Sequence, residues 1–170
     1  MDVERATPTR EQALRSLGRL VGTWTSEATH PAMPGAVLRG TASCEWLDGK
    51  RFLIQRMHVD HPDFPDAICI IGFTDRDRVD DQAAHPGGEG AKGKPAAMTM
   101  HYFDARGVFR VFETSIDDQA WRGWNDAPGF SQRFTATFGE DGNTIDARWQ
   151  LRRDDVHWND DMRVTYRRGR

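Results

Sequence analysis

An excess of charge of either sign is missing from this sequence. Its 23 lysines and arginines are balanced by 26 aspartates and glutamates, which leaves a formal net charge of −3. Proteins that bind DNA or RNA through the phosphate backbone present a strongly basic surface. The composition therefore excludes that class, and we expect no nucleic-acid partner.

Long hydrophobic runs and cysteines are also scarce. No segment approaches the ~20 apolar residues of a membrane span, and residues 1–10 carry charges and Pro8 where a secretory signal needs an apolar core. We therefore expect a cytoplasmic protein without a membrane partner. The two cysteines, Cys44 and Cys69, each lie in an apolar, strand-like run. Because cytosolic disulfides are rare, we predict two buried, unpaired thiols.

Familiar catalytic and cofactor motifs are absent as well. The chain has no Ser-His-Asp order, no Gly-x-Ser-x-Gly elbow, no phosphate-binding loop and no dinucleotide-binding fingerprint. Its length of 170 residues suits one domain, 1–170.

One helix is predicted, near the N-terminus, over residues 9–20. Ala13, Leu14, Leu17 and Leu20 recur at helical spacing, and Thr9 is suited to the N-cap position. We interpret this segment as a lid or plug for the structure that follows.

The rest of the chain is predicted to form ten β-strands. Turn residues separate the runs, as at Asp48-Gly49, Arg106-Gly107, Asp117-Asp118 and Asp141-Gly142-Asn143, and such residues form tight hairpins. Hairpins join antiparallel neighbours, and closure removes the unpaired edges of a large sheet. The sequence thus predicts an all-β, up-and-down antiparallel barrel. The expected strands are about 22–28, 38–47, 51–59, 67–74, 97–103, 107–115, 119–125, 131–138, 143–152 and 161–168.

One long segment interrupts this rhythm. Residues 75–95 are rich in Gly, Ala, Pro and charge and show no hydrophobic period. A segment of this kind buries too little apolar area to offset the entropy of ordering. We interpret it as a flexible loop, with an active-site lid as the alternative.

The order of these features resembles the calycin superfamily. The resemblance rests on Leu20-Val21-Gly22-Thr23-Trp24 after one helix, on residues 49–53 (GKRFL), and on the terminal strand 163–168 (RVTYRR). The chain is most similar to nitrobindin-like and fatty-acid-binding-like ten-stranded barrels. It also resembles uncharacterised bacterial lipocalin-like proteins, in which phrases such as residues 101–104 (HYFD) and 128–131 (PGFS) recur. The resemblance implies a hydrophobic cavity with Trp24 at its closed end and a ligand entering from the other.

The residues that bind ligands in those relatives have no counterparts in this sequence. Nitrobindin-like proteins hold haem through a histidine before the last strand, where this chain has Asp160 and Asp161. His157 lies close by, in an expected turn. Fatty-acid-binding members use an Arg-x-Tyr pair, whereas Arg163 and Tyr166 are three residues apart, so strand alternation points them to opposite faces. We therefore expect no cofactor and keep haem as a minor alternative.

Several polar residues on the expected strands are candidates for chemistry. Arg56 and His58 share one face of their strand and either line the cavity, with Glu45 or Glu113 as a partner for Arg56, or point to solvent. His101 is a candidate proton carrier. Residues 58–66 hold two histidines and three aspartates, which we interpret as a solvated turn rather than a metal site, because metal ligands usually come from several elements.

These observations lead to one principal hypothesis and its alternatives. The protein is expected to bind a small, largely apolar molecule in the barrel. The ligand-binding candidates are Trp24, Arg56, His58, His101, Glu113, Trp124 and Trp149. The alternative is a cofactor-independent isomerase or cyclase with His101, His58 and Glu113 as catalytic acids and bases. A third hypothesis is a fully packed barrel that acts through surface association, and a homodimer is left open.

Overall fold

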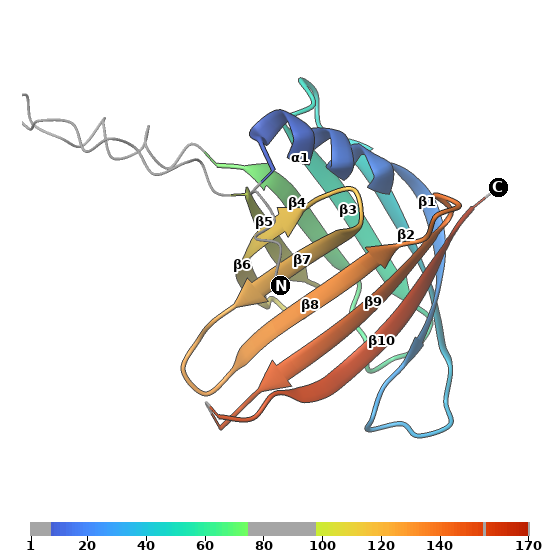
Figure 1. The fold of residues 1–170 in the computed structure, drawn as a ribbon. Coiled ribbons are helices and arrows are strands. Elements are labelled where there is room, and N and C mark those ends of the chain that lie inside the picture. The colour runs from blue at the N-terminus through green and yellow to red at the C-terminus, as the bar shows by residue number, and fades with distance from the viewer. Residues whose placement is uncertain (1–7, 75–97, 155, 170) are drawn as a thin grey trace, which may run out of the picture.

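Ten antiparallel strands close into a barrel in the computed structural model, which describes residues 8–74, 98–154 and 156–169 (Figure 1). Each strand pairs with the next along the chain, and β1 closes the barrel by pairing with β10. The strands are β1 (Gly22–Thr29), β2 (Leu38–Trp46), β3 (Phe52–Val59), β4 (Ala67–Phe73), β5 (Met98–Asp104), β6 (Phe109–Ile116), β7 (Ala120–Asn125), β8 (Ser131–Phe138), β9 (Thr144–Arg152) and β10 (Asn159–Arg168).

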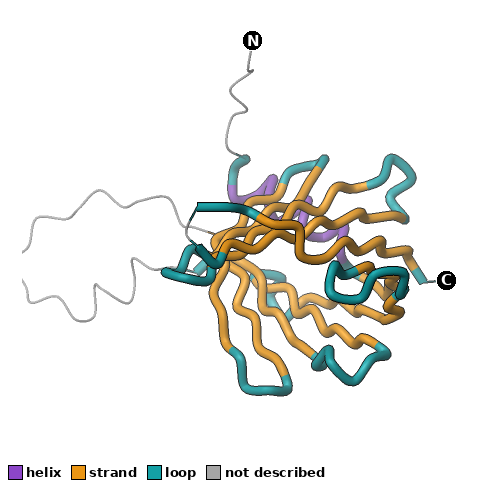
Figure 2. Tube along the Cα trace, turned by 90° about the horizontal axis from the view of Figure 1, so that it is seen from below, coloured by secondary structure: helices purple, strands orange, loops and turns teal. Residues whose placement is uncertain are grey.

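The one α-helix of the described residues, α1 (Arg10–Leu17), covers one end of the barrel and continues into a 3₁₀ turn (Gly18–Leu20) (Figure 1). Thr9 caps it as expected, because its hydroxyl accepts the Gln12 N–H at 3.2 Å while the Gln12 side chain accepts the Thr9 N–H at 2.8 Å. Leu17, the last residue of the helix, is fully buried. The helix thus plugs this end, and Figure 2 shows the strands around a common centre, seen from the opposite end.

Trp24 and Arg168 join the two ends of the chain beside the helix. The Trp24 Nε1–H donates to the Leu20 carbonyl at 2.8 Å, and the Arg168 guanidinium lies 4.2 Å from the Trp24 ring centroid. Arg168 also donates to the carbonyls of Val21 at 2.6 Å and Arg19 at 2.8 Å. The terminal strand is therefore held to the start of β1, and this end of the barrel is closed.

The hairpins owe their tightness to residues that suit each turn. Gly49, Gly107 and Gly142 have φ of 86°, 82° and 67°, values at which a Cβ atom would be strained. In the β6–β7 turn, Asp117 accepts the N–H groups of Gln119 at 2.8 Å and Ala120 at 2.9 Å. Burial by itself would raise the pKa of Asp117, but these bonds and the nearby Arg122 outweigh it and lower that pKa.

The barrel interior is filled near α1 and hollow toward the other end. Leu17, Leu20, Leu53, Ile71 and Ile116 pack together under the helix, each 3% exposed or less. The opposite end is built from the described residues of five loops, 30–37, 60–66, 105–108, 126–130 and 153–158 without residue 155. The hydrophobic core therefore supports the closed end and leaves the loop end free to hold a site.

The structure confirms the all-β barrel, its one helix, the ten strands and the two buried free thiols. The last strand begins at Asn159, two residues earlier than expected, because Asn159 and Asp160 already pair with β9 before a register shift between Asp160 and Arg163. The expected loop 75–95 lies outside the described residues. Among those described, no helix is long and apolar enough to span a membrane.

Candidate ligand cavity

A cavity of about 230 Å³ lies inside the barrel between the plugged end and the loop end. Trp24 and Leu20 form its floor, and Phe64 and Pro65 of the β3–β4 loop reach it from the loop end. The side chains around it come from every strand, because inward residues alternate with outward ones along each strand.

Four aromatic residues on β6–β9 make one wall of this cavity: Phe112, Trp121, Phe134 and Trp149. The Phe134 ring lies at their centre, with its centroid 4.8 Å from that of Trp121, 4.6 Å from that of Trp149 and 6.3 Å from that of Phe112. Gly123 on β7 makes this possible, because a Cβ atom there would lie 2.2 Å from the Phe134 ring. The wall is a broad, apolar surface of the kind that binds flat molecules.

The facing wall carries a row of polar side chains. Strand register places Cys44 opposite Gln55, Gln55 opposite Cys69, Cys69 opposite Tyr102, and Tyr102 opposite Arg110. All five line the cavity, because directly opposed residues on neighbouring strands point to the same side of the sheet. The cavity is therefore two-sided, with an aromatic wall and a polar row across β2–β6.

The thiols of Cys44 and Cys69 and the phenol of Tyr166, all in the lining, are protonated at neutral pH. Desolvation by burial raises the pKa of Cys44 and of Cys69 from 9.0 to about 12. Burial also raises the pKa of Tyr166 on β10, with a further contribution from the nearby thiols. At neutral pH these three groups are therefore uncharged hydrogen-bonding groups. The two thiols are also unreactive, because thiol reactivity requires the thiolate.

Gln55 and Tyr166 are among the lining residues with unused hydrogen-bonding capacity. The Gln55 side-chain amide is 8% exposed, and within the described residues neither it nor the Tyr166 hydroxyl has a hydrogen-bond partner. Buried polar groups normally have such partners. The cavity therefore offers donors and acceptors to a bound molecule.

Arg110 and Gln132 lie together at the loop end of the polar row. The Arg110 Nη1 donates to Gln132 Oε1 at 2.9 Å, and its guanidinium lies 4.7 Å from the Phe130 ring centroid. Tyr102, opposite Arg110, donates its hydroxyl to Asp104 Oδ2 at 3.2 Å. Burial first, and then Asp104, raise the pKa of Tyr102 to about 12.

A second polar contact lies at the loop end, between β1 and β10. The His30 Nε2 lies 3.2 Å from Asp161 Oδ1, and the Ala32 N–H donates to His30 Nδ1 at 3.1 Å. Because Nδ1 accepts, the neutral ring carries its proton on Nε2 and donates it to Asp161. Phe64 lies beside this pair, with its ring centroid 6.0 Å from that of His30. Loops 30–37 and 60–66 are thus fastened to the last strand at the loop end of the cavity.

The predicted polar candidates on β3 do not line this cavity, so their expected place inside is corrected. The side chain of Arg56 is 50% exposed and pairs with Glu45, one of its two expected partners. His58 is 57% exposed and lies 2.6 Å from Asp66. Both residues lie on the outer face, because Gln55 and Met57 occupy the inward positions of the same strand.

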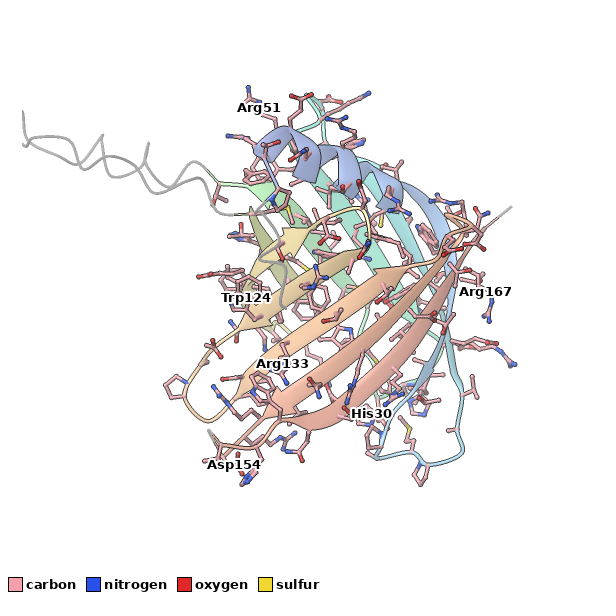
Figure 3. All side chains as sticks on the ribbon, in the orientation of Figure 1. His30, Arg51, Trp124, Arg133, Asp154 and Arg167 are labelled. Carbon is pink, nitrogen blue, oxygen red and sulfur yellow. The ribbon has the colours of Figure 1, made fainter. Side chains whose placement is uncertain are left out.

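His101, Glu113 and Trp124 are corrected for the same reason. His101 lies beside Phe109, a residue 55% exposed on the outer face of β6. Glu113 is exposed opposite Trp124, which is 39% exposed and labelled on the outside of the barrel in Figure 3. A molecule in the cavity is therefore out of reach of every acid or base proposed for the isomerase alternative.

Two of the predicted ligand-binding residues, Trp24 and Trp149, do line the cavity. Sequence reasoning missed Gln55, Arg110 and Gln132. Strand alternation places Arg110 on the same face as Phe112, and both line the cavity. Nothing in the sequence, however, shows which face of that strand points inward.

The donor set does not fit haem, the cofactor that the family resemblance implies. No imidazole of the described residues belongs to the cavity lining. His157 is 75% exposed and bound to Asp154, and Asp160 pairs with Arg148 on the outer face. Haem iron is held by an imidazole, by a thioether together with an imidazole, or by a deprotonated thiolate or phenolate, whereas burial keeps the lining thiols and the Tyr166 phenol protonated. The volume of 230 Å³ also lies below the ~300 Å³ at which drug-sized pockets begin. The expectation of no cofactor, with haem as a minor alternative, stays an untested prediction, and we derive no chemistry through haem.

Metal ligands are likewise dispersed. Within the described ranges, no group of three His, Cys, Asp or Glu side chains is arranged to hold a metal ion. His61, in the 58–66 segment, packs against Phe64 with ring centroids 5.7 Å apart.

Comparisons with known proteins identify the fold. No protein-family model matches the chain, and no curated protein matches it. Rv2717c from M. tuberculosis superposes with a TM-score of 0.60 at 13% identity, covering 93% of this chain and 98% of that one. The S-type phycobiliprotein lyase CPES from Guillardia theta does so with a TM-score of 0.51 at 8% identity, covering 96% and 99%. By its fold, this chain is a lipocalin-like, calycin-type ten-stranded barrel.

Proposed function

We propose that the protein binds a small, flat, largely apolar molecule in the barrel cavity. The observation that carries this proposal is the 230 Å³ hollow between the Phe112–Trp121–Phe134–Trp149 wall and the polar row. A barrel whose interior served packing alone would fill this volume with side chains. The fully packed alternative is therefore disfavoured.

The volume limits the size of the ligand. An apolar cavity of about 150 Å³ holds benzene, with six heavy atoms. By proportion, 230 Å³ suits roughly nine or ten heavy atoms. A bicyclic aromatic such as an indole or a naphthalene has this size, and its flat ring fits beside Trp149 and Phe134.

The unused hydrogen-bonding groups indicate a ligand with polar atoms. The Gln55 amide and the Tyr166 hydroxyl lie in the lining without protein partners among the described residues. Leaving such groups unpaired in a buried site costs free energy. A ligand with a hydrogen-bonding edge toward β3 and β10 would relieve that cost.

Two finer assignments belong to the same proposal. The nitrobindin-like and fatty-acid-binding-like branch is supported by the Gly22-Thr23-Trp24 start of β1 and the ten-strand count, although the ligands of that branch find no matching donors here. A cytoplasmic location is supported by Cys44 and Cys69, two free thiols.

The test is binding of 1-aminonaphthalene, a neutral bicyclic fluorophore, to the wild-type protein. We expect saturable one-to-one binding with a blue-shifted emission. Ala136→Leu adds three carbons to a cavity-lining position, and it should weaken binding about tenfold or more. Thr135→Leu places the same side chain at the adjacent, exposed position and should leave binding unchanged.

A second blocking variant, Ala147→Leu, guards against a folding defect in the first. Thermal melting of each variant reports whether it folds. If folded Ala136→Leu and Ala147→Leu bind the fluorophore as the wild type does, or if the wild type shows no saturable binding, the cavity does not hold the ligand and the proposal fails.

A further inference from the structure

We infer that the cavity ligand carries one anionic group, and that Arg110 binds it. This inference rests on the proposed function and adds a ligand class to it. It predicts how the ligand is oriented: its aromatic part lies deep in the barrel, and its charged group lies at the loop end.

Of the cationic side chains that line the cavity within the described residues, Arg110 is the one without a carboxylate beside it. Three charged residues line the cavity: Arg106, Arg110 and Asp161. Arg106 lies 3.7 Å from the Asp104 carboxylate, and Asp161 lies 3.2 Å from His30. No carboxylate of the described residues lies within 4.0 Å of Arg110, whose hydrogen bond goes to the neutral amide of Gln132.

The surroundings hold the Arg110 guanidinium in place without neutralising it. Its Nη1 is bound to Gln132 Oε1, and the Phe130 ring lies against the guanidinium at 4.7 Å. Removing a guanidinium from water costs free energy unless a counter-charge or hydrogen bonds compensate. An arginine kept partly buried beside a neutral partner is therefore well suited to an anion supplied from outside.

The remaining donors can hold the second oxygen of such an anion. Gln132 uses its carbonyl oxygen for Arg110, so its amide N–H groups face no partner within the described residues. Arginine and amide N–H groups together make the charge-assisted pattern that carboxylates prefer. Gln132 is 9% exposed, which keeps bulk water from competing for the same contact.

The position of Arg110 also fits the aromatic wall. Phe112 lies two residues further along the same face of β6, and Phe134 lies two residues beyond Gln132 on β8. Two residues along a strand span about 6.6 Å. A ring against Phe134 and a carboxylate attached directly or through one carbon would therefore reach both. On the other side of the loop end, Asp161 repels an anion and favours the Arg110 side.

The test compares two ligands of one shape and different charge. 2-Naphthoate carries a carboxylate, and 2-naphthamide replaces it with a neutral amide; each is measured by displacement of 1-aminonaphthalene. With the wild type we expect 2-naphthoate to bind about 10- to 100-fold more tightly than 2-naphthamide, because the carboxylate forms charge-assisted hydrogen bonds with Arg110, which are stronger than those of a neutral amide. 2-Naphthyl phosphate, measured in the same way, shows whether the anion is a carboxylate or a phosphate.

Arg110→Gln should abolish the preference for naphthoate while changing the affinities for naphthamide and 1-aminonaphthalene less than about threefold. Arg110→Lys keeps the charge and should retain part of the preference. Arg133→Gln is the matched control, because it removes one positive charge from the residue after Gln132. Arg133, labelled in Figure 3, lies on the outer face of β8, and its guanidinium stacks on the Trp158 ring.

The outcomes separate this inference from the proposed function. If 1-aminonaphthalene binds but the wild type does not distinguish naphthoate from naphthamide, the anion site is wrong and the cavity proposal stands. The inference also fails if Arg110→Gln weakens all probes equally, or if Arg133→Gln removes the preference as well. Failure of 1-aminonaphthalene to bind the wild type overturns the proposed function itself.

Discussion

Replacing Trp24 tests how the closed end of the barrel is held together. Trp24→Ala removes a ring that is 3% exposed, a hydrogen bond to the Leu20 carbonyl and the ring beneath the Arg168 guanidinium. Trp24→Phe keeps most of the apolar ring but loses the Nε1–H. The pair of variants separates packing from the hydrogen bond.

The magnitudes follow from these contacts. Truncating a buried large aromatic to alanine costs about 3–5 kcal/mol. The hydrogen bond accounts for about 1 kcal/mol of this and the cation–π contact for about 0.5–2 kcal/mol. We therefore expect Trp24→Ala to lose about 3–5 kcal/mol of unfolding free energy and Trp24→Phe about 1–2 kcal/mol. For a chain of this size, the alanine variant should melt about 6–20 °C below the wild type.

Urea and thermal unfolding, followed by circular dichroism, measure both losses. Trp124→Ala is the control, since that side chain is 39% exposed on the outer face of β7 and should cost no more than about 1 kcal/mol. A loss below about 1.5 kcal/mol for Trp24→Ala, or equal losses for the two tryptophans, would refute the reasoning that the Trp24 contacts close the barrel.

Further predictions concern titration, the helix cap and the outer face. Because the pKa values of Cys44 and Cys69 are raised from 9.0 to about 12, their contribution to stability is complete below pH 9 and is lost as pH rises toward 12; Ellman's reagent at pH 8 should react far more slowly with the folded than with the unfolded protein. Asp117→Ala should cost about 1–2 kcal/mol at pH 7; since the pKa of Asp117 is lowered from 3.8, the wild type should lose this advantage as pH falls below 3.8, and a pH-independent difference would contradict the assignment. Thr9→Ala should cost about 1 kcal/mol in urea unfolding, whereas Thr9→Ser should cost little. Arg56→Leu should change stability by less than about 1 kcal/mol and leave 1-aminonaphthalene affinity unchanged, because the pair with Glu45 is exposed; a clear loss of affinity would return Arg56 to the site.

The turns and strands of this barrel could be predicted because their causes are local. Gly49, Gly107 and Gly142 have positive φ, which few other residues tolerate. Thr9 caps the helix because its hydroxyl accepts the N–H of Gln12, only three residues further along the chain. A series of strands linked by hairpins leaves unpaired backbone groups on its two edge strands, and closing the sheet into a barrel pairs them. The fold class and the strand boundaries thus follow from short-range chemistry.

The cavity lining depended on information that short stretches do not contain. On β3, the outward face carries Ile54 and Arg56, and the inward face carries Gln55 and Met57, so each face mixes apolar and polar groups. Period-two alternation states which residues share a face but not which face points inward.

Only closure of the barrel decided that question. Once β1 pairs with β10, register places Gln55, Tyr102 and Arg110 on one side of the interior and Phe134 and Trp149 on the other, although these residues are far apart in the sequence. The volume left between them depends on the sum of side chains from ten strands. The amino-acid sequence by itself determined a barrel closed by a helix, and the tertiary structure decided its cavity and the inward position of Arg110.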